Sequence, residues 1–251
     1  MPKLKGFTLI ELLVVIAVIA ILMAILMPAL RAAKDQAARV HCVSNVKTLT
    51  LGWIMYKDEF DDKIVPGHVG SGQWVERPNN ADSWDLKKAA IRRGLLFKYV
   101  GENVDIYRCP ADRRRESSSL PVAFRTFSIA GGANGESGGG YDIAKLCTEI
   151  KQPATKYIFV EEMDTRGCNI GSWIMQVKNL RWTDPVAMWH NNKTTLGFAD
   201  GHGEMHTWEN QHFINWCGTA MNDPQRFSFG LTPPAGEQED IEYMARGYPH
   251  K

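Results

Sequence analysis

Histidine and carboxylate side chains gather in the last third of the sequence, in a pattern that could bind a metal ion. Nine residues separate the first histidine from an Asp-Gly pair, and further candidates alternate directly after that pair. Imidazole and carboxylate groups are common zinc ligands. The candidate ligands are His190, Asp200, His202, Glu204 and His206.

Two strands are expected to carry these side chains, from Thr194 to Ala199 and from His202 to Trp208. Asp200-Gly201 between them is a favoured two-residue hairpin turn, in which both residues take positive φ. This register predicts one core-facing set and one opposite set. The core-facing set is Leu196, Phe198, Gly203 and Met205, and the opposite set is Thr195, Gly197, Ala199, His202, Glu204 and His206.

Strand geometry limits which of these residues could share an ion. His202 and His206 are four strand residues apart, about 13 Å, which is too far for two ligands of one zinc ion. Only a subset such as His190 with His202, or His202 with Glu204, could converge. The alternative is that His190 satisfies polar groups of the turn. We therefore expect no metal or other cofactor, and His190, Asp200 and His202 are the residues that a bound metal would use.

Cysteine chemistry offers a second set of candidates. The segment Ile106 to Asp112 contains Cys109-Pro110-Ala111-Asp112 and predicts a strand that ends in a turn, because proline cannot continue a central strand. No cysteine pair has C-x-x-C spacing, and an odd number leaves at least one thiol outside any intrachain disulfide. Buried, unpaired thiols are the alternative. The five cysteines are Cys42, Cys109, Cys147, Cys168 and Cys217, of which Cys42 is expected to remain unpaired.

Signals for an enzyme or a nucleic-acid-binding protein are missing from the sequence. It has no Gly-x-Ser-x-Gly elbow and no phosphate-binding Gly-x4-Gly-Lys-Ser loop. Glu161 and Glu162 are adjacent strand residues, so they are expected to face opposite sides of a sheet. Lys and Arg number 29 against 28 Asp and Glu, a net charge of +1 that leaves no basic excess for a phosphate backbone. We expect neither an enzyme nor a nucleic-acid partner.

An uncharged apolar run from Leu12 to Leu30 follows Glu11 near the start of the sequence. As a helix it would be about 28 Å long, which is close to the hydrocarbon thickness of a bilayer. Lys3 and Lys5 precede it, and positive residues hold that end of a span in the cytoplasm. A plain membrane anchor, with Glu11 reaching the interface, is the simplest interpretation of this segment alone.

The order Gly6-Phe7-Thr8-Leu9-Ile10-Glu11, followed by the apolar run, resembles the N-terminus of type IV pilin-like prepilins, a family that includes the type II secretion pseudopilins. The resemblance implies that a prepilin peptidase cuts between Gly6 and Phe7 and methylates the new amino terminus. It also implies that Glu11 pairs with the free amine of a neighbouring subunit. Pro28 falls where pilins carry a helix-loosening proline.

Two further elements resemble parts of large pseudopilin-like proteins: Cys109-Pro110-x-Asp112, and His190 followed after nine residues by Asp200-Gly201. The resemblance implies a single-pass protein of the bacterial inner membrane with its head in the periplasm or outside the cell. It further implies four partners, which are prepilin peptidase, other pilin or pseudopilin subunits, an inner-membrane assembly platform and the lipid bilayer.

The predicted fold class is α+β, a long N-terminal helical stem packed on an antiparallel sheet. Apolar residues continue at helical spacing beyond Pro28 to about Phe60, which predicts a stem roughly 80 Å long. Proline and acidic residues near the end predict a surface extension with a loose tail. The expected parts are a leader (1–6), a stem (7–62, spanning the membrane over about 9–30), a head (63–210, with the hairpin at 190–208) and a C-terminal extension (211–251).

The function that this organisation predicts is a structural subunit of a type II secretion or type IV pilus-like filament. One alternative is a membrane-tethered module that binds polysaccharide through Trp74 and Trp84, both in segments expected to be loops. Another is a metal-dependent head built around His190 and Asp200.

Overall fold

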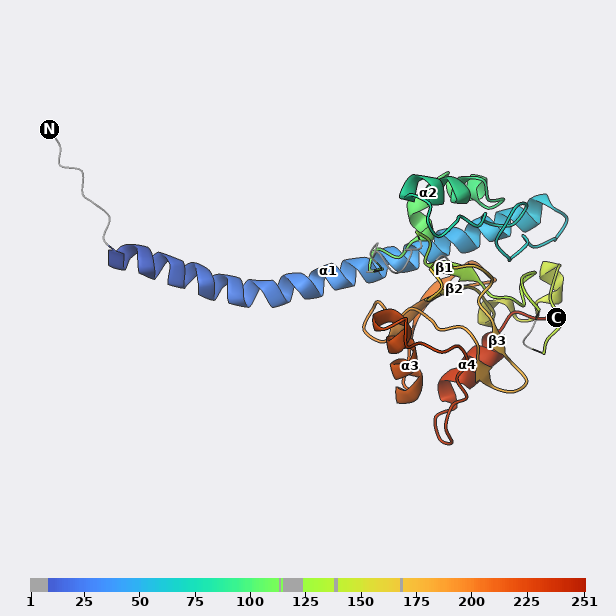
Figure 1. Ribbon diagram of the computed structural model, residues 1–251. Coiled ribbons are helices and arrows are strands. Elements are labelled where there is room, and N and C mark those ends of the chain that lie inside the picture. Colours follow the sequence, from blue (N-terminus) through green and yellow to red (C-terminus); the bar gives the residue numbers. More distant parts are fainter. Residues whose placement is uncertain (1–8, 113, 115–123, 138–139, 168) are drawn as a thin grey trace.

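A long helix projects from a compact head in the computed structural model, which describes residues 9–112, 114, 124–137, 140–167 and 169–251 (Figure 1). This helix, α1 (Leu9–Glu59), has 51 residues, so it is about 76 Å long. Pro28 lies inside it, and the helix curves gently along its length. The predicted stem is confirmed from Leu9 onward, and the predicted cleavage residues Gly6 and Phe7 lie outside the described residues.

The N-terminal half of α1 contacts no part of the described head. Residues 9–37 are all exposed, and their large apolar side chains show 46–79% of their surface. Within the described residues, α1 is the one helix long and apolar enough to cross a membrane. Leaving so much apolar surface in water is unfavourable, so this half requires lipid or protein around it.

The C-terminal half of α1 packs on the sheet of the head. Its buried residues recur at steps of three or four, as one face of a helix must. A Cβ added at Gly197 would lie 2.6 Å from Thr50, and one at Gly203 would lie 2.8 Å from Val46. These two glycines therefore let the helix approach the strands closely. The buried stem residues are Cys42, Val46, Leu49, Thr50, Gly52, Trp53 and Tyr56.

The main sheet has four strands in the order β1-β2-β5-β6, and every neighbouring pair is antiparallel. This confirms the α+β class with an antiparallel sheet. The strands of this sheet are β1 (Phe127–Ile129), β2 (Tyr157–Glu161), β5 (Lys193–Phe198) and β6 (Gly203–Thr207), and a separate pair consists of β3 (Met175–Gln176) and β4 (Arg181–Trp182). The other elements are α2 (Trp84–Arg92), α3 (Gln211–Asn222), α4 (Glu239–Gly247) and the 3-10 turns η1 (Phe97–Val100), η2 (Val104–Tyr107), η3 (Cys147–Glu149) and η4 (Pro153–Thr155).

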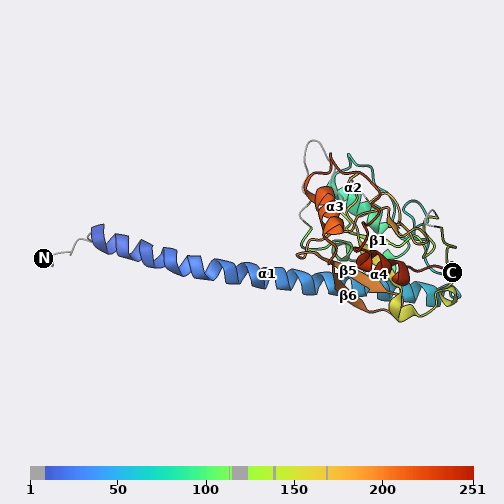
Figure 2. The same ribbon diagram turned by 90° about the horizontal axis from the view of Figure 1, so that it is seen from below.

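Apolar cores lie on both faces of this sheet. Phe159 on β2 joins Val46 and Trp53 of α1 in the first core. Val160 and Leu196 face the other way, into a second core with residues of α3 and α4. Figure 2 shows β5 and β6 beside α1. The sheet is thus the middle layer between the stem and the C-terminal helices, an arrangement that buries both of its faces.

The C-terminal segment completes the second core. Phe213 and Cys217 of α3, Ile241 and Met244 of α4, and Tyr248 after α4 are all buried. The prediction of a surface extension with a loose tail is therefore wrong. The prolines and the acidic run that suggested an extension lie between and around two short helices, each of which buries apolar residues on one face.

The hairpin between β5 and β6 differs from its prediction by one residue. Gly197 pairs with Gly203, and the Phe198 amide donates to the His202 carbonyl at 2.8 Å, so the loop consists of the three residues 199–201 instead of two. Gly201 has φ of 98°, whereas Asp200 does not take positive φ. A shift of one residue moves each side chain of β6 to the other face. Met205 consequently lies opposite Thr195 on the stem-facing side, while the predicted histidine face turns toward the second core.

Candidate functional site

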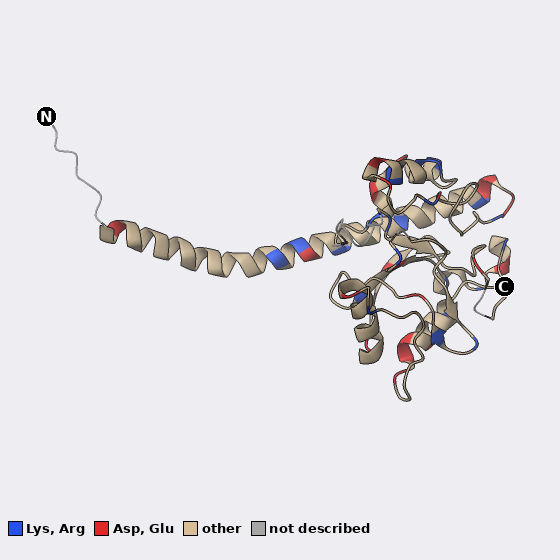
Figure 3. Ribbon diagram, viewed as in Figure 1, with Lys and Arg blue, Asp and Glu red and all other residues tan. Residues whose placement is uncertain are grey.

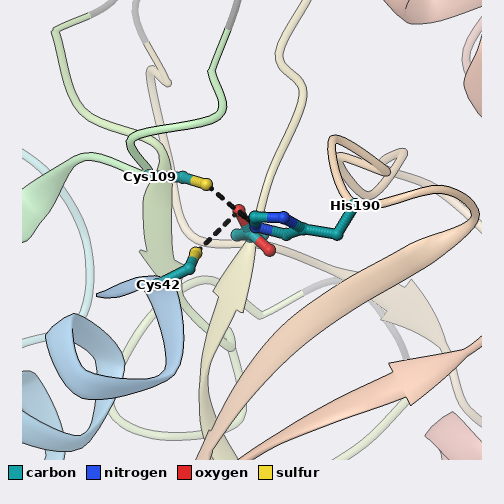
Figure 4. A group of neighbouring side chains, drawn as sticks. Cys42, Cys109 and His190 are labelled. Atoms are coloured by element: carbon teal, nitrogen blue, oxygen red, sulfur yellow. Dashed lines mark hydrogen bonds and ion pairs between the residues drawn. The ribbon is translucent and has the colours of Figure 1, made fainter. Parts of the chain in front are cut away.

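Four potential metal ligands meet where α1 enters the head. They are Cys42 on α1, Cys109 after η2, Glu161 at the end of β2 and His190 in the turn before β5. Their ligand atoms all lie within 4.8 Å of one another, and no side chain exposes more than 3% of its surface. Figure 4 shows Cys42, Cys109 and His190 pointing toward a common centre. We call these four residues the junction cluster.

Short contacts link the members of the junction cluster. Cys109 Sγ lies 3.1 Å from His190 Nε2, and Cys42 Sγ lies 3.2 Å from Glu161 Oε1 (Figure 4). His190 Nε2 is 3.8 Å from the same Glu161 oxygen. The cluster therefore presents two sulfurs, one nitrogen and one oxygen at short range to one another.

The Cys-Pro-x-Asp element positions Cys109. The Asp112 amide donates to the Cys109 carbonyl at 3.0 Å, which closes a turn. Ahead of it lies the 3-10 turn η2, so the strand predicted over Ile106 to Asp112 is wrong, although the predicted turn is present. Arg108, which follows η2, has an extended backbone and leads into Cys109 and Pro110.

Asp112 holds this turn through a buried ion pair. Its Oδ2 accepts hydrogen bonds from Arg114 Nη2 at 2.7 Å and from the Thr126 hydroxyl at 2.9 Å. The same Thr126 oxygen accepts from the Cys109 amide at 3.1 Å. Burial by itself would raise the pKa of Asp112, but the charge and hydrogen bonds of Arg114 outweigh it and hold that pKa below its ordinary value. The aspartate thereby fixes the backbone of Cys109.

Local geometry also orients Glu161 and His190. Glu161 Oε2 accepts from the Thr195 amide at 2.7 Å, which leaves Oε1 directed at the cluster. Asn191 and Asn192 follow His190 with φ of 60° and 57°. Asparagine tolerates this left-handed conformation better than most residues, so the chain can turn sharply directly after the histidine.

Burial favours the uncharged forms of all four cluster residues. It raises the pKa of Cys109 to about 12 and also raises the pKa values of Cys42 and Glu161. Burial, with a smaller contribution from the Arg39 charge, lowers the pKa of His190 to about 4. The imidazole is therefore neutral at physiological pH and keeps a lone pair that a metal ion can accept.

The structure separates His190 from Asp200 and His202. These residues flank opposite ends of β5, whose six residues span about 16 Å. His202 Nδ1 instead lies 2.6 Å from Asp200 Oδ1, and its ring stacks on Phe198. The pairing of His190 with His202 is consequently wrong, and so is a role for His190 within the Asp200-Gly201 turn.

His206 and Glu204, the remaining metal-ligand candidates of the hairpin, contact Tyr243 of α4. The ring of His206 stacks on Tyr243 with centroids 3.9 Å apart, and Glu204 accepts a hydrogen bond from the Tyr243 hydroxyl at 2.7 Å. Neither residue reaches the junction cluster.

Cys42 and Glu161 were not among the site residues predicted from sequence. Cys42 was assigned to the stem, and Glu161 was considered only with Glu162 as a possible acid pair. The sequence contains thiol, imidazole and carboxylate residues beyond the apolar run, but nothing in their spacing shows that these four meet. Cys42, Cys109, Cys147 and Cys217 are free thiols, and Cys168 lies outside the described residues.

The polysaccharide alternative loses its main support. Trp74 is fully buried, at a ring-centroid distance of 5.5 Å from Phe159 and 5.9 Å from Tyr107. Trp84 is half-buried against Phe124. Trp74 is therefore a core residue and cannot stack on a sugar.

The membrane end of the molecule carries a different kind of site. Figure 3 shows one acidic segment at the start of α1, which is Glu11, followed by a long uncharged stretch. Residues 1–27 match a known family, described as the prokaryotic N-terminal methylation motif. No curated protein and no solved structure matches the chain. The motif, together with a long apolar N-terminal helix packed on an antiparallel sheet, gives the chain the N-terminus and the layout of a type IV pilin-like prepilin.

Proposed function

We propose that this protein is a structural subunit that is cleaved after Gly6, methylated at Phe7 and assembled through α1 into a type II secretion or type IV pilus-like filament. The observation that carries this proposal is the methylation motif over residues 1–27, which runs directly into the exposed apolar half of α1. The proposed location is the bacterial inner membrane, crossed once, with the head in the periplasm or outside the cell.

The shape of α1 supports assembly as well as anchoring. A plain anchor needs about 20 apolar residues, which the run up to Leu30 already supplies, whereas the exposed part of α1 continues through residue 37 and includes the charged Arg31, Lys34 and Asp35. The same apolar surface can face lipid before assembly and neighbouring helices in a filament. The same helix surface would thus contact lipid in a subunit that waits in the membrane and contact other subunits in the filament.

Glu11 is the residue proposed to set the register between subunits. A carboxylate beside an apolar run is costly unless it is paired, and the new amino terminus of a neighbouring subunit would supply the opposite charge. The proposed partners are prepilin peptidase, further pilin or pseudopilin subunits and an assembly platform in the inner membrane.

Intact mass and N-terminal peptide sequencing test the processing step. The full chain is expressed with an active prepilin peptidase and, in parallel, with a catalytically dead one. A chain that starts at N-methylated Phe7 only with the active enzyme is the expected result. A chain left uncut, or cut after the apolar run, would contradict the proposal.

Filament yield in a reconstituted assembly system tests the role of Glu11. Glu11→Ala should be processed normally and yet lose at least tenfold in filament yield. Asp58→Ala removes an exposed acidic side chain from the other end of the same helix and serves as the matched control. Equal filament yields from the two variants would refute the pairing role.

A further inference from the structure

We propose that the junction cluster is a structural zinc site, in which Cys42 Sγ, Cys109 Sγ, Glu161 Oε1 and His190 Nε2 bind one Zn²⁺ and fasten the stem to the head. The sequence by itself predicts no metal, because strand spacing keeps most of the candidate ligands near the hairpin apart. This site is independent of processing and filament assembly, so either proposal can fail without the other.

The spacing of the ligand atoms fits a tetrahedral ion. Zinc–sulfur bonds of about 2.3 Å and zinc–nitrogen or zinc–oxygen bonds of about 2.0–2.1 Å place neighbouring ligand atoms roughly 3.3–3.8 Å apart. The measured separations are 3.1 Å from Cys109 Sγ to His190 Nε2, 3.2 Å from Cys42 Sγ to Glu161 Oε1 and 3.8 Å from His190 Nε2 to that oxygen. Side-chain movements of well under 1 Å would bring these three separations into the tetrahedral range.

The kinds of donor select the metal. Two cysteine sulfurs with one imidazole suit Zn²⁺, whereas Mg²⁺ and Ca²⁺ prefer sites made of oxygen alone. All four side chains are buried and come from the protein, so no position is left open for a water or a substrate. A closed set of four ligands is typical of structural rather than catalytic zinc.

Hydrogen bonds from outside the cluster hold three of the ligands. The Thr195 amide binds the second oxygen of Glu161, and the Thr195 hydroxyl lies 3.3 Å from Cys42 Sγ. The Ala111 amide lies 3.4 Å from Cys109 Sγ. Partners of this kind orient metal ligands and are a regular part of metal sites.

A role in hydrogen bonding alone explains the cluster poorly. Thiols are weak donors and weak acceptors, so two of them compensate little for burying a carboxyl group and an imidazole. Zinc binding would release the two thiol protons to solvent, and the ion with two thiolates, a carboxylate and a neutral imidazole would carry a net charge of −1. Arg39 of α1 is close enough for its positive charge to act on His190 and would offset that charge.

The site lies where the stem joins the head, so a bound ion would connect these two parts. Cys42 is the first buried residue of α1, so the ion would tie the stem to the sheet at the point where the helix leaves the head. A surface cavity of about 440 Å³, lined in part by His41, Asn45, Cys109 and Pro110, provides a path for the ion.

Metal analysis of the full-length chain in detergent tests the proposal directly. After growth with added zinc and gel filtration, we expect about one Zn²⁺ per chain. Exchange with Co²⁺ should give the intense visible bands of a tetrahedral ion and a thiolate-to-cobalt charge-transfer band. A zinc content below about a tenth of an ion per chain after this growth would overturn the proposal, as would an octahedral cobalt spectrum. These measurements use the unaltered chain, so they do not depend on whether a variant folds.

Variants assign the ligands. Cys109→Ser and His190→Ala should each reduce bound zinc at least tenfold, and Cys109→Ser should also remove the charge-transfer intensity due to that sulfur. Cys147→Ser changes a half-buried thiol outside the cluster and should keep the full zinc content. Intact mass and thiol alkylation of the unaltered chain reveal the competing outcome. A Cys42–Cys109 disulfide without zinc would overturn the proposal and assign the two sulfurs to a covalent link instead.

Discussion

At the scale of single residues, Asp112 fixes the position of one member of the junction cluster, Cys109. Asp112 lies outside the junction cluster. Its carboxylate accepts a hydrogen bond from the Thr126 hydroxyl, and the oxygen of that hydroxyl accepts one from the Cys109 amide. The charge on Asp112 is fully buried and is compensated by Arg114 at 2.7 Å. Losing one partner of such a pair leaves the other charge uncompensated in a low-dielectric interior.

Asp112→Asn should therefore lower the free energy of unfolding of the head by about 3–5 kcal/mol. The pKa of Asp112 is held below its ordinary value, so the stabilisation from its charged form is present above about pH 3.9 and is lost as pH falls through the lower folded-state pKa. The variant should lack this acid-dependent part of the stability. Near-ultraviolet circular dichroism during thermal unfolding, at several pH values, measures both effects.

Asp223→Asn is the matched control, because its partner Arg226 lies 3.4 Å away with both side chains largely exposed. Exposed pairs contribute about 0–1 kcal/mol, so this variant should unfold like the unaltered chain. Equal losses of stability in the two variants would contradict the special role of the buried pair.

At the scale of elements, the fit between α1 and the sheet depends on strand positions that lack side chains. Gly197 and Gly203 lie opposite each other on β5 and β6, beneath the helix. A Cβ at Gly197 would lie 2.6 Å from Thr50 Cγ2 and 2.7 Å from Val46 Cγ2. Both distances are shorter than van der Waals contact, so the helix or its side chains would have to move.

Gly197→Ala should accordingly destabilise the head by about 1–3 kcal/mol, which is the usual effect of overpacking. Thermal unfolding of the full chain in detergent measures the change. Gly218→Ala in α3 introduces the same methyl group where no atom lies within 4 Å. It should leave stability unchanged or raise it by up to about 1 kcal/mol, since alanine favours a helix. A neutral Gly197→Ala would show that the stem and sheet are less tightly packed than the structure indicates.

At the scale of the whole molecule, the two parts of α1 have different effects. The first part exposes apolar surface and so limits solubility, and the second part is buried and so stabilises the head. Residues 9–37 are exposed, and the apolar surface among them needs lipid or protein around it. The segment from Cys42 to Tyr56 belongs to the core of the head. The head should therefore fold without the first part and fail without the second.

Removal of residues 1–30 should yield a head that stays monomeric without detergent and melts at nearly the same temperature as the full chain, because residues 9–30, the described part of this segment, are all exposed. Removal of residues 1–46 also takes away Cys42 and Val46 and should lower the melting temperature or abolish cooperative unfolding. Gel filtration with light scattering and thermal unfolding distinguish these cases. Aggregation of the shorter truncation without detergent would show that another apolar surface needs cover.

Local sequence determined the stem, the apolar span and the strands near Thr194–Ala199 and His202–Trp208, because helical spacing, apolar length and β-branched content act over a few neighbouring residues. The methylation motif is likewise contiguous. Tertiary structure decided the hairpin register, since a turn of two or three residues fits Asp200-Gly201 and packing beneath α1 selects between them. It also decided that Cys42, Cys109, Glu161 and His190 meet, because their proximity arises from a helix, two turns and a strand packing together, and no spacing along the chain encodes it.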